Sequence, residues 1–155
     1  WAELAEAVRR EALNDAERSR LLVEQRNSFV QVEIALIRFD SEPAAKEAYL
    51  CVECDRMELE TVAQLAGYPI QRMVSFHHEL PEALRIPVLG AHSGSTLHPQ
   101  ANNGTYDLCR VIRHCEPRLE DPAVRAAVDD LLVRRRLGSA GLYPVRWHLK
   151  EDASE

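Results

Sequence analysis

The residues of this chain best suited to chemistry are its histidines. His77, His78 and Glu79 are adjacent, and His92 and His98 follow in the same stretch. Imidazoles around one cleft can move protons or bind a metal near neutral pH. Neighbours on an extended chain point to opposite faces, so only one of His77 and His78 readily faces a given site. Three interpretations follow: structural histidines, pocket-lining groups, or ligands of a metal-dependent enzyme.

The four cysteines at positions 51, 54, 109 and 115 are the other candidate ligands. They are too few for a disulfide scaffold in a chain that can build a core. Cys51 and Cys54 fall inside a predicted helix, and Cys109 and Cys115 lack ordinary zinc-ligand spacing, although their strand parity puts them on one face. Structural zinc and redox activity are alternatives. We expect buried apolar side chains, with no metal and no cofactor.

Composition excludes several classes of protein. The formal charge of −6 argues against a nucleic-acid partner, because phosphate binding needs clustered Lys and Arg. No stretch approaches the roughly 20 apolar residues that cross a bilayer, so we expect no membrane partner. The N-terminus shows no export-signal pattern, and with so few cysteines the expected location is cytoplasmic. There is no nucleophile-elbow, Walker-type or dinucleotide motif.

The elements that would position these residues begin with helices and a strand. Spaced apolar residues among dense Glu and Arg predict an amphipathic helix over residues 2–23. Near-alternating β-formers predict a strand over residues 28–39. Helices are expected over residues 43–54, where a proline fits the first turn, and over residues 58–66, where Gly67 ends the helix.

The second half of the chain predicts a long irregular region between regular elements. Prolines and glycines break up residues 68–104, with only a helical turn over 80–84. A hairpin turn then leads into a central strand over residues 105–114. An Asp-Pro start predicts a helix from residue 122 that Gly138 ends, and a proline-containing edge strand is expected over residues 143–149.

This order of elements and several short segments resemble the parvulin (PpiC-type) peptidyl-prolyl isomerases. Ile34-Ala35-Leu36-Ile37 resembles the family's first strand, and Leu80-Pro81-Glu82-Ala83-Leu84 its pocket helix. The segment from Gly94 to Pro99 and the closing strand Gly104-Thr105-Tyr106-Asp107-Leu108-Cys109-Arg110-Val111 complete the likeness. The resemblance covers more than half of the chain.

The resemblance implies an α+β fold with a small antiparallel or mixed sheet flanked by helices, parvulin-like and FKBP-like. An N-terminal helix and a C-terminal helix and strand are additions. We therefore divide the chain into an amphipathic N-terminal helix at 1–27, a parvulin-like domain at 28–117, and a C-terminal helix, strand and acidic tail at 118–155.

The resemblance also implies a site, with departures from the family's pattern. The family's two histidines fall near Ala35 and at Asp107, so the polar centre is lost or replaced. We take Asp107 and His78 as candidate catalytic residues. The candidate substrate-binding residues, which include the apolar pocket positions, are Leu80, Leu84, Phe76, Tyr106 and His77.

The expected function is peptide binding. Lowering the roughly 20 kcal/mol barrier of amide rotation needs no nucleophile, so a degenerate site weakens isomerase activity without excluding it. The chain resembles diverged members associated with peptide maturation in natural product biosynthesis, which implies a chaperone or weak peptidyl-prolyl cis-trans isomerase acting on a precursor peptide. An alternative is a non-enzymatic adaptor whose N-terminal helix docks on a partner enzyme or forms a homo-oligomer.

Overall fold

The computed structural model describes residues 14–139. The chain forms two compact units, each considered by itself. One is Gln25–Pro117, and the other combines Trp1–Glu24 with Arg118–Glu155. The predicted strand at 143–149 and the first part of the predicted helix at 2–23 lie outside the described residues. Within 14–139, no helix has the length and apolar character needed to cross a membrane.

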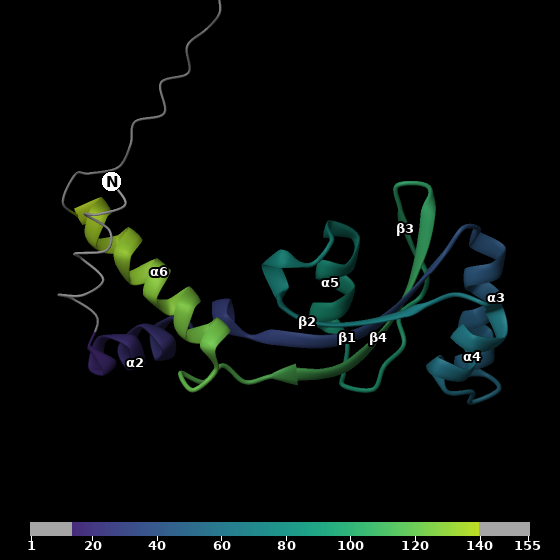
Figure 1. The fold of residues 1–155 in the computed structure, drawn as a ribbon, viewed down its shortest axis with the longest axis horizontal. Helices are drawn as coiled ribbons and strands as arrows, with labels where there is room; N and C mark the ends of the chain where they lie inside the picture. The colour runs from purple at the N-terminus through teal and green to yellow at the C-terminus, as the bar shows by residue number, and fades with distance from the viewer. Residues whose placement is uncertain (1–13, 140–155) are drawn as a thin grey trace, which may run out of the picture. The chain divides into compact units, whose positions relative to one another are not determined.

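The unit Gln25–Pro117 is built on a four-stranded antiparallel sheet (Figure 1). After the 3-10 helix η1 (Arg26–Phe29), the strands are β1 (Gln31–Phe39), β2 (Ile70–Phe76), β3 (Gln100–Asn102) and β4 (Thr105–Cys115), in the spatial order β2-β1-β4-β3. β1 is central and almost entirely buried, which explains its near-continuous Val, Ile and Leu content. The predicted strands at 28–39 and 105–114 are thus confirmed, with β1 starting three residues later.

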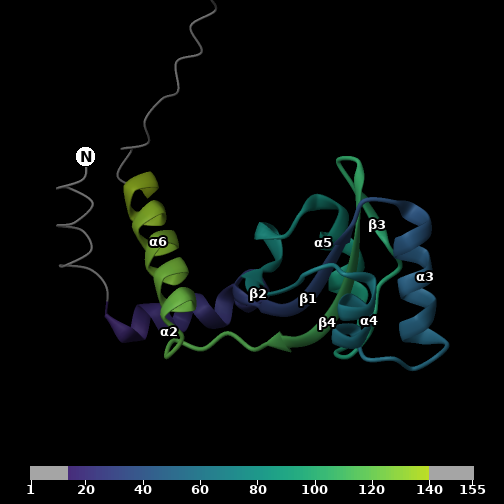
Figure 2. The same cartoon turned by 45° about the vertical axis from the view of Figure 1, so that its right-hand side comes forward.

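Helices cover both faces of this sheet. On one face, α3 (Glu42–Glu53) and α4 (Leu59–Ala66) pack on Ala35, Ile37 and Phe39. On the other, α5 (Glu82–Gly90) packs on Val32, Ile34 and Leu36 (Figures 1 and 2). Successive strand residues point to opposite faces, so β1 supplies alternate side chains to the two cores. The expected α+β class is confirmed.

Two predicted turns have the backbone geometry their residues favour. Gly67 ends α4 in the left-handed conformation with φ of 75°. Asn103 and Gly104, with φ of 47° and 86°, join β3 to β4. Positive φ at both central residues matches the right-handed twist of the paired strands, which is why an Asn-Gly turn closes this hairpin.

The prediction of an irregular stretch over 68–104 is wrong in part. It contains β2, the 3-10 helix η2 (His77–Glu79), α5 and β3. β2 is an edge strand with few buried side chains, so its alternation is weak in the sequence. The expected helical turn at 80–84 extends to Gly90 because Pro87 removes only one helical hydrogen bond, to the exposed Ala83.

A bulge in β4 overturns the expectation that Cys109 and Cys115 share a face. Cys109 pairs with Leu36 and Cys115 with Gln31, while the register shifts between Glu33 and Ile34. Opposed residues in an antiparallel pair lie on the same face, and positions 31 and 36 of β1 lie on opposite faces. One extra residue in β4 therefore reverses the parity.

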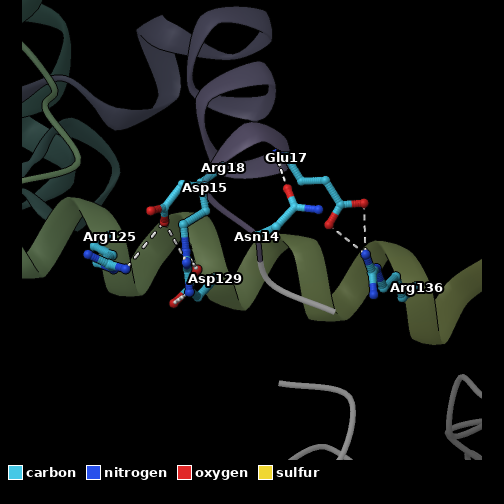
Figure 3. A network of polar contacts seen from close by, with 7 residues as sticks. All are labelled: Asn14, Asp15, Glu17, Arg18, Arg125, Asp129 and Arg136. Carbon is cyan, nitrogen blue, oxygen red and sulfur yellow. Dashed lines mark hydrogen bonds and ion pairs between the residues drawn. The ribbon is translucent and has the colours of Figure 1, made fainter. Parts of the chain in front are cut away.

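The second unit brings α2 (Asp15–Glu24) against α6 (Pro122–Ser139) through ion pairs (Figure 3). Arg18 donates to Asp129 at 2.7 and 3.1 Å, and Arg136 donates to Glu17 at 2.6 Å. Four valines and leucines are buried here: Leu21, Val124, Val128 and Val133. Gly138 does not end the helix as predicted, since α6 continues to Ser139; one glycine lowers helix stability by about 1 kcal/mol without breaking the helix.

We predict that Leu84→Ala lowers the free energy of unfolding by about 2–5 kcal/mol, because it leaves a cavity under α5. Leu89→Ala is a matched control on the same helix: Leu84 is 0% exposed and Leu89 is 69% exposed. The control should change stability by less than about 0.5 kcal/mol. Urea unfolding of both variants measures the difference, and equal losses would contradict the placement of α5.

Candidate functional site

A pocket of about 530 Å³ lies between the start of α5 and the β3–β4 hairpin. One wall is the start of α5, which belongs to the segment that resembles the family's pocket helix. The other wall is the β3–β4 hairpin, which leads into the segment that resembles the family's closing strand. The lining residues are Pro81, Glu82, Ala83, Ala101, Asn102 and Asn103. Its size suits one or two side chains of a bound chain.

Asp107 lies next to this pocket and is tied to it through Asn102. Its carboxylate is 1% exposed and accepts two hydrogen bonds from Arg38, at 2.7 Å from Nε and 3.1 Å from Nη2. Asn102 Nδ2 donates a third at 2.8 Å to Oδ2. The hydrogen bonds that Arg38 donates to Asp107 raise the pKa of Arg38. The three residues come from β4, β1 and β3, so one carboxylate joins three strands.

This arrangement makes Asp107 a structural anchor. A carboxylate that accepts three hydrogen bonds, two from a guanidinium, is aimed at its partners rather than at a ligand. Neither Arg38 nor Asn102 was identified from the sequence as a partner of Asp107. Arg38 opposes Asp107 in the β1–β4 pairing, which the register alone reveals.

The predicted pocket residues Leu80 and Leu84 lie in the core beneath α5. They are 1% and 0% exposed and pack with Val32, Ile34 and Leu36. In this conformation they offer a ligand almost no surface, so their role in substrate binding stays a prediction.

Ala35 and Tyr106 lie on the opposite face of the sheet from Asp107. Both pack in the core under α3 and α4, whereas Arg38 and Asp107 lie on the α5 face. Ala35 itself therefore does not share a face with Asp107, because the sheet separates the two positions. The β1 residues that share the face of Asp107 are Ile34, Leu36 and Arg38.

Phe76, His77 and His78 gather at the far end of the sheet. The rings of Phe76 and His78 stack at 5.5 Å, and those of His77 and His114 at 5.6 Å. Phe76 pairs with Gln31 at the start of β1, while Asp107 opposes Arg38, about 23 Å further along the strand at 3.3 Å per residue. The structure does not bring the two candidate catalytic residues, Asp107 and His78, to one centre.

The remaining histidines and the cysteines are dispersed. His98 stacks on Tyr49 of α3 at 4.4 Å, and His92 is exposed on a loop. Within residues 14–139, no three His, Cys, Asp or Glu side chains are grouped to hold a metal ion. Burial raises the pKa of the Cys109 thiol to about 12, which suppresses its reactivity. Cys54, expected to be buried, is exposed.

Comparisons with known proteins agree with the fold. Foldase protein PrsA from Streptococcus pneumoniae matches with a TM-score of 0.50 and 13% identity, over 89% of this chain and 53% of that one. PrsA from Lactococcus lactis matches with a TM-score of 0.48 and 10% identity, over 91% of this chain and 54% of that one. A peptidylprolyl isomerase (PrsA) from Bacillus anthracis matches with a TM-score of 0.44 and 9% identity, over 90% of this chain and 70% of that one. No protein-family model and no curated protein matches.

The likeness to the S. pneumoniae foldase supports a parvulin-like α+β fold. This chain spans about half the length of the S. pneumoniae and L. lactis foldases.

We predict that Asp107→Ala lowers the free energy of unfolding by about 2–3 kcal/mol, because three hydrogen bonds are lost. The half-exposed Arg38 can turn to water, which limits the loss. Glu33→Ala is the control, since its partner Arg113 joins the same two strands with a side chain 68% exposed, and it should cost less than 1 kcal/mol. Chemical unfolding compares the two, and a smaller loss for Asp107→Ala would oppose the anchor role.

We predict that His77 makes the protein less stable in acid. Burial, and secondly the nearby His114, lower the pKa of His77 below its usual 6.5, so the unfolded chain takes up that proton first. The free energy of unfolding should fall as pH drops below about 6.5. His77→Phe should flatten this dependence in unfolding curves between pH 5 and 8. An unchanged slope would rule out the contribution of His77.

Proposed function

We propose that this chain is a diverged parvulin-like domain that binds an extended polypeptide segment and acts as a chaperone, with at most weak peptidyl-prolyl isomerase activity. The observation that carries this proposal is the pocket between α5 and the β3–β4 hairpin, which lies beside the segments that resemble the family's pocket helix and closing strand. None of the five candidate substrate-binding residues lines it. The named activities of the similar structures, foldase and peptidylprolyl isomerase, support the same class of ligand.

The geometry of the site favours binding over turnover. The buried carboxylate beside the pocket, Asp107, is fully engaged by Arg38 and Asn102, and the lining Glu82 is exposed to solvent. His77 and His78 lie at the other end of the sheet. General acid–base catalysis needs a group within hydrogen-bond reach of the reacting atoms. The pocket can still hold a proline ring or another small side chain and restrict its conformations.

Two further parts of the proposal concern the cellular location of the chain and the peptide that it handles. The free thiols of the exposed Cys54 and half-buried Cys51 fit a reducing compartment, which supports a cytoplasmic location. A site that binds without strong catalysis suits the handling of a precursor peptide during its maturation. Residues beyond this chain would then supply any chemical step.

The adaptor role is an alternative proposal for the unit that contains α2. Val23 on this helix is 79% exposed, which would suit a partner helix or a second copy. Much of the charge on α2 is already paired with α6, which leaves less of it for a partner. Deleting residues 1–23 should leave peptide binding unchanged under the main proposal and abolish self-association or partner capture under this alternative.

We predict that the tetrapeptide succinyl-Ala-Leu-Pro-Phe-4-nitroanilide binds this pocket and that Ala83→Arg weakens binding at least tenfold by filling it. Ala126→Arg is the matched control, since it makes the same change at an exposed position on α6. Calorimetric titration measures both dissociation constants. Equal affinities for wild type and Ala83→Arg would refute the location, and no binding by wild type would refute the function.

A further inference from the structure

A second pocket, of about 650 Å³, lies away from the one described above. It is formed where α3 ends and α4 begins, together with the loop that precedes Leu97 and the β4 residue Arg110. Arg110 is on the face of the sheet that α3 and α4 cover, opposite Asp107. The polar lining residues are Glu53, Arg56, Glu58, Ser93, Ser95, Thr96 and Arg110.

The loop wall of this pocket is held firmly against β4. Gly94 N donates to Val111 O at 2.7 Å, and Val111 N donates to Ser95 O at 2.9 Å. Leu97 N donates to Cys109 O at 2.8 Å. The segment thus pairs with the outer edge of β4 like a short strand, so the wall is preformed and a ligand would pay little entropy to order it.

Thr96 presents an unused hydrogen-bonding group in this wall. Its Oγ1 is buried and has no hydrogen-bond partner among residues 14–139. A buried hydroxyl without a partner is unfavourable, and a native structure that keeps one calls for an explanation. A ligand that enters the pocket and bonds this hydroxyl supplies one.

Two arginines beside Thr96 have spare donors. Arg110 donates to Gly94 O at 3.3 Å and to Glu58 Oε2 at 3.5 Å, which are long, weak contacts that use two of its five N–H groups. The exposed Arg56 makes no hydrogen bond or ion pair with any other residue of the described part of the chain. Guanidinium and hydroxyl donors together match a carboxylate.

We propose that this pocket binds a carboxylate group of a polypeptide, with Arg110, Arg56 and Thr96 as its donors. The two glutamates in the lining balance the two arginines, so a group with one negative charge fits better than a phosphate with two. The volume exceeds that of a single carboxylate and leaves room for the residues that carry it.

Glu58 is the internal competitor for this site. Its side chain is 75% exposed and approaches Arg110 at only 3.5 Å, so an incoming carboxylate can take its place. Removing the charge of Glu58 should therefore tighten carboxylate binding. If the contact between Glu58 and Arg110 were only structural, its removal would not be expected to tighten binding.

The test is a titration followed by amide chemical shifts, with three probes on the full chain. These are acetyl-Ala-Ala-Ala with a free terminal carboxylate, the same peptide with a terminal amide, and acetyl-Ala-Glu-Ala-amide. Titration with the first or the third peptide should shift the amide signals of Gly94, Ser95 and Arg110 until they saturate. The peptide with the lower dissociation constant shows whether the pocket prefers a terminal or a side-chain carboxylate. The neutral peptide should leave these signals unchanged.

Variants complete the test. Glu58→Gln should tighten binding at least threefold, and Glu120→Gln, an exposed control in the other unit, should not. Thr96→Val should weaken binding at least threefold while the melting temperature stays equal or rises, because the variant no longer buries an unpaired hydroxyl. Equal shifts with the neutral peptide, tighter binding of inorganic phosphate, or no gain in Glu58→Gln would each overturn the proposal. The pocket does not involve Ala83, so this result is independent of the proposed α5 site.

Discussion

The arrangement of the α5 face depends on one ion pair, between the buried Asp107 and the half-exposed Arg38. Removing a carboxylate from water is unfavourable unless its oxygens are bonded, and here two guanidinium N–H groups and Asn102 satisfy them. Because the three partners come from three strands, satisfying the charge also fixes the register of β4 with β1 and the position of the β3 hairpin. The wall of the candidate pocket is set by this requirement.

The same sheet separates two kinds of surface. Its α5 face holds an apolar core of aliphatic side chains and a pocket at the hairpin, whereas the pocket beside its other face offers two arginines and an unpaired hydroxyl. A polypeptide bound at both pockets would be held through a small side chain at one pocket and through a carboxylate at the other. Among the described residues, neither pocket is lined by a histidine or by a buried carboxylate, which is consistent with a domain that holds a chain more than it transforms one.

Much of the fold could be predicted because its signals are local. The apolar density of β1, the Asn-Gly turn and the helix-ending Gly67 each act within a few residues. β2 could not be found this way, because an edge strand buries few side chains and leaves little alternation.

The candidate site was harder to predict, because its geometry depends on register. Asp107 stands out in the sequence as a candidate site residue, but its pairing with Arg38 is fixed only by strand register. The bulge in β4 puts Cys115 on the opposite face from Cys109, and Ala35 lies on the opposite face of the sheet from Asp107. Leu80 and Leu84 matched a family pattern, yet apolar type alone does not distinguish a pocket wall from a core.

The most direct test of the account is a nuclear Overhauser experiment on the protein with the proline tetrapeptide bound, combined with exchange peaks between its cis and trans forms. The account predicts contacts from the peptide to Ala83 and Ala101, with exchange scarcely faster than in the free peptide. Contacts at His77 and His78 instead, or strong acceleration of exchange, would contradict it.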